Sequence, residues 1–265
     1  MARIARVLVP DTPHHIVQRG NRRQDVFFHA DDYHHYLQLI SHGCREEGIA
    51  IWNYCLMANH VHLILTPRPE SNLSRAVGEA HRRYTRYINL RENWRGYLWQ
   101  GRFSSFPMDE PHWLSAAAYV ELNPVKANIT PTAWDYRWSS VHAYLSGNSD
   151  GIVTLEPLRS RVKDWKAFLE SRMSDDITTA FEAHERTGRP MGGEPFIQRI
   201  SDMLGRNLLP QKPGPKRKDA KDARDKYCVP LINAIPNCRT IFTVATDAGS
   251  AGHTNSRQPR DAKRI

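Results

Sequence analysis

The sequence has 265 residues and a formal net charge of +9, because 37 Lys and Arg residues outnumber 28 Asp and Glu residues. A chain of this length can bury a substantial core and has room for one domain with an extension or for two small domains. The positive charge favours a polyanionic partner, nucleic acid before a membrane surface. No apolar run approaches the roughly 20 residues that a membrane span needs.

The cysteines and the N-terminus narrow the class further. The four cysteines have no CxxC spacing, which indicates neither a disulfide framework nor a cysteine zinc site. The N-terminus lacks the long apolar segment of a signal peptide. We therefore expect a cytoplasmic protein of bacterial type, associated with the nucleoid.

The hydrophobic pattern of the first half predicts the order β-α-β-β-α-β-α. The predicted elements are a strand over 14–20, a helix from Asp31 to Gly48, strands over 49–57 and 60–67 joined by the Ala58-Asn59 turn, a helix over 72–90, a short strand over 102–108 and a helix over 112–123 that Pro124 ends. This order, which the family resemblance described below also supports, is the ferredoxin-like split βαβ plan. The predicted fold class is thus α+β, an antiparallel sheet with helices on one face.

The composition changes after the predicted sheet domain. We expect a first domain over 1–148, a helical C-terminal extension over 149–210 and a basic tail over 211–265. The stretch SGNSDG (146–151) has the composition of a linker. The tail is rich in Pro, Gly and charge, which predicts disorder.

Two histidines, His60 and His62, stand one residue apart in the apolar strand YCLMANHVHLIL (54–65). Alternate side chains of a strand leave the same face, so both imidazoles project together. They could be buried, hydrogen-bonded core histidines, but two on one face are costly to bury without purpose. A zinc site needs further Cys or His ligands that the spacing does not supply. A histidine-triad hydrolase needs a third histidine where this chain has Ile64.

A hard cation, Mg²⁺ or Mn²⁺, remains as the partner of this pair, because such ions use few protein ligands and bind substrate phosphate oxygens. The stretch AAAYVELNPVKA (116–127) supplies a candidate nucleophile, Tyr119, after three small alanines. Asn123 lies one helical turn further on the same face and offers a neutral third ligand. From spacing alone, a tyrosine on a helix is more often a packing residue than a nucleophile.

The sequence resembles the REP-associated tyrosine transposases, which belong to the single-tyrosine HUH transposases related to insertion sequence 200. The matching stretches are PHHIVQRGNRRQDVFF (13–28), YCLMANHVHLIL (54–65), AHRRYTRYIN (80–89), LWQGRF (98–103), YVELNPVKA (119–127), YRWSSVHAYLSG (136–147), TGRPMG (187–192) and LGRNLLP (204–210). Ala58 replaces the proline usual before Asn-His, and the residues from about 227 onward match nothing in the family.

This resemblance implies a function and roles for the site residues. His60 and His62 are implied as metal ligands with Asn123 as the third, and Tyr119 as the nucleophile that forms a 5′-phosphotyrosine bond and leaves a free 3′-hydroxyl. The implied substrate is single-stranded or hairpin DNA of a repeat palindrome, cleaved and rejoined during transposition. Residues 1–148 would then be the catalytic domain.

A groove of cations should hold the DNA strand. The candidate arginines flank the predicted site and are Arg19, Arg22, Arg23, Arg82, Arg83 and Arg102. Two alternatives remain open at this point: a non-catalytic ferredoxin-like module that binds single-stranded nucleic acid, and an HUH nuclease of the replication-initiator or relaxase type.

Overall fold

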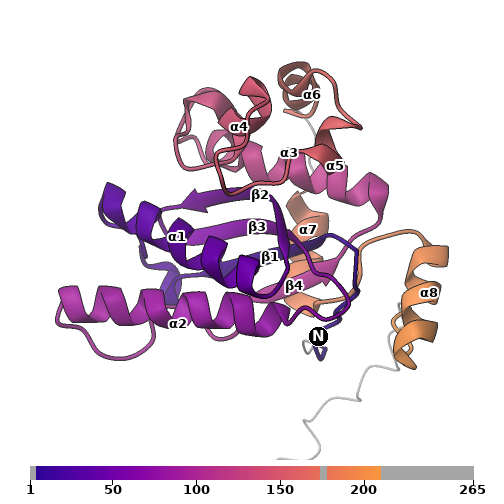
Figure 1. Cartoon of the computed structure of the whole chain (residues 1–265), viewed down its shortest axis with the longest axis horizontal. Coiled ribbons are helices and arrows are strands. Elements are labelled where there is room, and N and C mark those ends of the chain that lie inside the picture. The colour runs from indigo at the N-terminus through magenta and orange to yellow at the C-terminus, as the bar shows by residue number, and fades with distance from the viewer. Residues whose placement is uncertain (1–3, 174–177, 210–265) are drawn as a thin grey trace, which may run out of the picture. The chain divides into compact units, whose positions relative to one another are not determined.

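A four-stranded antiparallel sheet organises the chain, whose computed structural model describes residues 4–173 and 178–209. The described elements are β1 (His14–Arg19), η1 (Asn21–Arg23), α1 (Ala30–Glu46), β2 (Ala50–Met57), β3 (His60–Thr66), α2 (Leu73–Arg91), β4 (Ser104–Pro107), α3 (Glu110–Lys126), η2 (Ala133–Asp135), α4 (Val141–Ser146), α5 (Glu156–Arg159), α6 (Trp165–Ser171), α7 (Thr178–Thr187) and α8 (Glu194–Leu204). The strand order is β2-β3-β1-β4, the ferredoxin-like arrangement (Figure 1). The predicted α+β class and the ferredoxin-like antiparallel sheet are confirmed.

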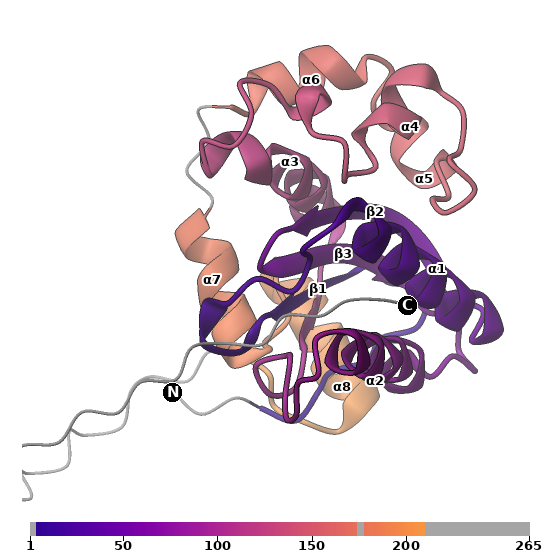
Figure 2. The ribbon, with the colours of Figure 1, turned by 90° about the vertical axis from the view of Figure 1, so that its left-hand side faces the viewer.

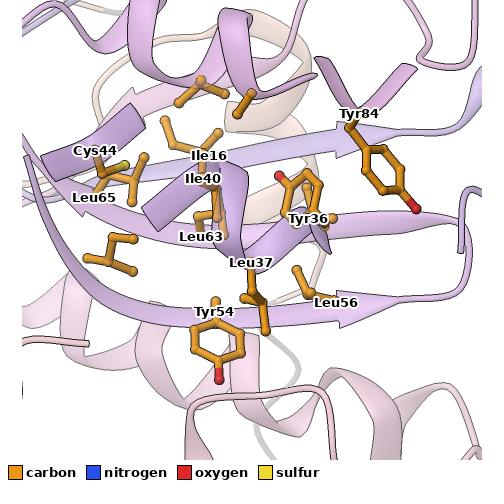
Figure 3. Packing of buried hydrophobic residues seen from close by; sticks show 14 of the residues in the cluster. Ile16, Tyr36, Leu37, Ile40, Cys44, Tyr54, Leu56, Leu63, Leu65 and Tyr84 are labelled. Atoms are coloured by element: carbon orange, nitrogen blue, oxygen red, sulfur yellow. The ribbon is translucent and has the colours of Figure 1, made fainter. Parts of the chain in front are cut away.

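One face of the sheet packs against α1 and α2 (Figure 3). Ile16 of β1 and Leu63 of β3 meet Tyr36 and Ile40 of α1 and Tyr84 of α2, and all five side chains are fully buried. Ile16 and Leu63 are directly opposite each other in the β1–β3 pair and therefore lie on the same face of the sheet. This face holds the two helices that the predicted fold placed on one side.

The opposite face is covered by α3, so the helices lie on both faces and not on one (Figure 2). Cys55, Ile64 and Phe106 of the sheet pack against the small residues Ala116 and Ala117 of α3. Small side chains let the helix approach the sheet closely. This second helical layer forms one wall of the candidate site.

The helix α3 is longer than predicted, because Pro124 lies inside it and does not end it. Proline has a helical φ and removes only one backbone donor, so the last turn continues to Lys126. The Ala127 amide still donates to the Asn123 carbonyl (2.9 Å). At the other end Asp109 caps the helix by accepting from the His112 amide (3.3 Å).

A buried carboxyl group, Glu121, ties α3 to its neighbours. It accepts hydrogen bonds from Asn53 Nδ2 (2.8 Å), Ser140 Oγ (2.8 Å) and Trp165 Nε1 (2.6 Å). Burial raises the pKa of Glu121 to about 7. The bonds join β2, the start of α4 and α6 to the helix that carries Tyr119.

The predicted C-terminal extension contributes α7 to the site. Phe181 of α7 is fully buried beside Phe106 of β4 and Tyr119 of α3. The described residues belong to one compact unit. The boundary predicted at 148/149 stays a prediction, and the predicted tail lies outside the described residues. Within residues 4–173 and 178–209, none of the helices combines the length and the apolarity needed to cross a bilayer.

Candidate active site

His60 and His62 project from β3 toward α3. Ile64, at the next alternate position, packs in the α3-side core, whereas Val61 and Leu63 pack in the core beneath α1 and α2. His62 is fully buried and His60 is 9% exposed. Their ring centroids lie 4.8 Å apart with nearly perpendicular planes. The prediction that both imidazoles share one face is therefore confirmed.

The tautomer of His60 is fixed by Asn59. The amide nitrogen of Asn59 donates to the Arg23 carbonyl (3.2 Å), which orients the amide so that Oδ1 faces His60 Nδ1 (2.6 Å). A carbonyl oxygen only accepts, so His60 Nδ1 must carry the proton. His60 Nε2 is then left with a lone pair, as a metal ligand requires.

His62 has an analogous partner in His15, on the neighbouring strand β1. His15 Nε2 lies 3.0 Å from His62 Nδ1, and the rings stack with centroids 5.2 Å apart. On the other side of the ring, Asn123 Nδ2 lies 3.3 Å from His62 Nε2. A donor at that position leaves the Nε2 lone pair of His62 pointing to Asn123. Both imidazoles thus have a partner at Nδ1, and Nε2 carries the lone pair, which in His62 accepts the hydrogen bond from Asn123.

Tyr119 lies one turn before Asn123 and shares its environment. Its ring stacks on Phe181 of α7 (4.8 Å, 3° between planes) and meets the edge of His62 (5.6 Å). The hydroxyl hydrogen-bonds to Asn123, and burial, reinforced by the charge of Glu185, raises the pKa of Tyr119 to about 12. The phenol therefore keeps its proton at neutral pH. The residues predicted as ligands and nucleophile thus lie together.

Burial holds the histidines of the site in the neutral form. Desolvation, with the positive charge of Arg19 nearby, lowers the pKa of His15 and of His60 to about 3. The same causes, together with its two histidine neighbours, place the pKa of His62 well below the usual range. Neutral imidazoles keep the lone pair that a cation needs.

A second set of possible ligands shares His62. His15, His62 and Glu185 each offer an atom within 4.8 Å of the others. Glu185 of α7 also pairs with Arg19 at 3.4 Å, and His15 Nδ1 is a buried atom without a hydrogen-bond partner among the described residues. His15 was not predicted as a site residue, although it lies on a predicted strand whose apolar and polar residues alternate. Glu185 was not predicted either, because no local sequence pattern places α7 beside β1.

A cleft of about 530 Å³ opens beside the histidine pair. His60, Arg19 and Arg23 line it, with Glu182 and Glu185 of α7 on its wall. Of the predicted DNA-binding arginines, Arg19 and Arg23 lie at the site. Both Arg22 and Arg23 have positive φ (55° and 62°), so η1 forms a tight turn that presents them.

The other predicted arginines lie further from the histidines. Arg22 borders a depression beside Trp94, and Arg82 and Arg102 border a cavity against α2. Arg83 lies exposed on α2 and pairs with Glu79 (2.8 Å). The predicted set is therefore spread around one end of β1 and does not form a single patch.

Comparison with known proteins finds a family match for the part of the chain that carries the sheet and α3. The family described as "Transposase IS200 like" matches residues 9–123. This match confirms the resemblance found in the sequence: residues 9–123 are similar to the IS200-like (Y1) transposases, a family of DNA strand transferases. No curated protein matches the chain.

Two solved structures are similar to parts of the chain. One is a REP-associated tyrosine transposase bound to a REP hairpin, at 18% identity and a TM-score of 0.49, covering 58% of this chain and 92% of that one. The other is a Deinococcus radiodurans R1 protein provisionally assigned as a transposase, at 19% identity and a TM-score of 0.32, covering 45% and 95%. The family assignment rests on the sequence match.

The buried histidines predict a loss of stability in mild acid. His14 has a pKa lowered by burial to about 4, and His15, His60 and His81 to about 3. These histidines take up protons near pH 6.5 in the unfolded chain but only at lower pH in the folded chain. Their contribution to the stability of the fold is therefore complete above pH 6.5 and falls as the pH falls toward 4. Each contributes up to about 1.4 kcal/mol per pH unit. Glu121 has the opposite effect, because its raised pKa stabilises the folded chain as the pH falls, but it is one group against four histidines.

Urea unfolding at pH 7.5 and at pH 5.5 measures this effect. We expect a midpoint clearly lower at pH 5.5, and the same difference in a control with exposed His42 replaced by Gln. Equal midpoints at the two pH values would contradict the burial of neutral histidines.

Proposed function

We propose that the chain is a single-tyrosine transposase that cleaves and rejoins single-stranded or hairpin DNA, with Tyr119 as nucleophile. The observation that supports this most is that Asn123 contacts His60, Nε2 of His62 and the Tyr119 hydroxyl, so the predicted ligands and nucleophile meet around one side chain. The family assignment of residues 9–123 supplies the reaction class. Arg19 and Arg23 line the adjoining cleft, where a phosphate would bind, together with the carboxylates of Asp25, Glu182 and Glu185.

The chemical step needs one bond to form and one to break. The Tyr119 oxygen attacks the phosphorus of a DNA phosphodiester, and the bond from phosphorus to the 3′-oxygen breaks. The products are a 5′-phosphotyrosine ester and a 3′-hydroxyl, which takes up the proton that the phenol gives up. The ester conserves the phosphodiester energy, so a 3′-hydroxyl that attacks it rejoins the strand without ATP.

The donor set fits a divalent cation. His60 and His62 present neutral nitrogens, and Asn123 can turn its carbonyl oxygen toward them, since the two ends of a carboxamide are similar in size. Mg²⁺ or Mn²⁺ held there would polarise the phosphoryl group and stabilise the charge on its oxygens. Glu185 lies within reach of His62 and offers a carboxylate as a further oxygen ligand.

The geometry gives less support to the two alternative functions that the sequence left open. A module of the RNA-recognition type reads bases with aromatic side chains on an open sheet face, whereas here α1 and α2 cover one face and α3 the other. One observation favours a non-catalytic protein: Tyr119 is only 5% exposed beneath Phe181. A nuclease of the initiator or relaxase type would use the same residues, and its substrate would distinguish it.

Replacing Tyr119 by Phe tests the nucleophile. The variant loses one oxygen and keeps the stacking on Phe181, so stability and DNA affinity should be retained while cleavage and the covalent adduct disappear. Labelled single-stranded DNA should form a denaturation-resistant adduct with the unsubstituted chain, and peptide mapping should place it on Tyr119. Tyr97→Phe, at an exposed tyrosine, is the matched control for adduct formation.

An adduct on another residue, or one that persists in Tyr119→Phe, would show that the nucleophile is wrong. If no single-stranded or hairpin substrate gives an adduct, the non-catalytic module becomes the better account.

Replacing Asn59 tests how the metal site is preorganised. Asn59→Ala removes the acceptor of His60 Nδ1, so the imidazole can change tautomer, and Mn²⁺ affinity should fall about 10- to 100-fold. Asn59→Asp keeps an acceptor oxygen and should retain most of the affinity. Calorimetric titration of Mn²⁺ into the complex with DNA measures both, and EDTA should abolish cleavage by the unsubstituted chain. Equal affinity in the Ala variant and the unsubstituted chain would refute the role of Asn59, and full cleavage in EDTA would refute the metal.

A further inference from the structure

A second cavity lies on the opposite side of β1 from the histidine pair. It has a volume of about 540 Å³ and is bounded by α2 and by the loop 96–103 that precedes β4. This volume lies within the roughly 300–1,000 Å³ of small-molecule sites. We call it the α2 cavity.

Aromatic rings form the lining of the α2 cavity. His81 and Trp99 lie with centroids 4.7 Å apart, and Phe103 meets the edge of His81 at 6.2 Å. All three are at most 7% exposed. The side chain of Gln18, 2% exposed, adds a polar group to this lining and donates to the Gly101 carbonyl (3.3 Å). A flat aromatic ligand with polar edges suits such a lining.

The helix α2 leaves this space open at Gly78. A Cβ placed there would meet no heavy atom within 4 Å beyond its own helix and chain neighbours. A methyl group therefore fits at this position, whereas a large side chain would project into the α2 cavity, which Gly78 lines.

Tyr97 stands between the α2 cavity and a second depression. It is 86% exposed and lines both hollows. The second one, about 430 Å³, is also bordered by Trp94, Arg22 and Arg95. Exposed aromatic rings flanked by arginines are the elements from which stacking platforms for single strands are built.

Arginines surround the rim. Arg6 lies over the Phe103 ring (3.8 Å), and Arg82 and Arg102 border the same opening. Glu79 offsets part of this charge through its pair with Arg82 (2.7 Å). Arginines at the opening and aromatic side chains in the lining together favour an anionic ligand that carries flat rings.

The same backbone connects this region to the catalytic cleft. Trp99 forms a β-bridge with Gly20, and Gln100 N donates to the carbonyl of Arg19 (2.8 Å). The Arg19 side chain lines the cleft beside His60. A strand bound in the cleft can therefore continue around the end of β1 to Tyr97.

We propose that the α2 cavity and Tyr97 form a nucleobase-binding subsite, which holds unpaired bases of the DNA strand that continues from the cleaved phosphate. This inference rests on the proposed function and deepens it. Tyr97 stacks one base, and the α2 cavity receives another between Trp99 and Gly78. The rim arginines bind the phosphates between them.

Affinity measurements on the full chain carrying Tyr119→Phe test the subsite without cleavage. Tyr97→Ala should weaken binding of a single-stranded oligonucleotide about 5- to 150-fold, the loss of one stacked base. The salt dependence should stay the same, because no charge is removed. Tyr97→Trp should keep the affinity, and Leu90→Ala, at an exposed apolar residue of α2, should leave it unchanged.

Filling the cavity provides a second test. Gly78→Phe adds a ring inside the α2 cavity and should weaken oligonucleotide binding, whereas Gly78→Ala adds one methyl group and should not. The melting temperature of each variant shows that the fold is kept. Unchanged affinity in both Tyr97→Ala and Gly78→Phe would overturn the proposal. It would also be overturned if these variants lost self-association and kept DNA binding, because the α2 cavity would then bind a second copy of the chain.

Photocrosslinking of 5-iodouracil oligonucleotides to the chain without subsite substitutions supplies a readout independent of any variant. We expect crosslinks in peptides containing Tyr97 or Trp99, and crosslinks confined to other peptides would refute the subsite. The Tyr119 adduct is measured separately on the chain without the Tyr119 substitution, so the proposed function and the subsite can fail independently.

Discussion

The two-residue alternation of β3 is the constraint on which the site depends. It sends Val61, Leu63 and Leu65 into the core under α1 and α2, and His60 and His62 toward α3. A shift of register by one residue would exchange the two sets and bury the imidazoles in the larger core. Pairing with β1 fixes the register, with His62 opposite Val17.

Hydrogen bonds then set the chemistry of these imidazoles. Asn59 holds the Nδ1 proton of His60, and His15 occupies Nδ1 of His62. Burial keeps the rings neutral, so both Nε2 atoms remain donors to a cation at neutral pH. The positive charge of Arg19 contributes to the same effect from the cleft. Under the proposed function, residues that do not contact the cation would thus orient the ligand atoms that hold it.

The sequence predicts the elements of the sheet and the residues that share a face, because both depend on local periodicity. The strands predicted over 14–20, 49–57 and 60–67 each differ from β1, β2 and β3 by one residue at one end. The pairing of Tyr119 with Asn123 likewise follows from helical spacing. Pro124 was predicted to end its helix. In the last turn of α3, however, a proline removes only one backbone donor, so the helix continues to Lys126.

Contacts between elements that are distant in sequence could not be predicted. His15 meets His62 across 47 positions through strand pairing, and Glu185 reaches Arg19 across 166. Phe181 covers Tyr119 because α7 packs beside β4, and no repeat or motif in the sequence indicates this. The position of α3 on the second face also depends on packing, since small alanines are compatible with either side.

The central claim is that Nε2 of His60 and of His62, with Asn123, hold the cation beside Tyr119. Anomalous diffraction from crystals of Tyr119→Phe grown with Mn²⁺ and single-stranded DNA locates the ion directly. The account predicts a peak bound to both Nε2 atoms and to a DNA phosphate oxygen, with His15 still bonded to His62 Nδ1. A peak held by His15 and Glu185, with His60 unbound, would contradict it.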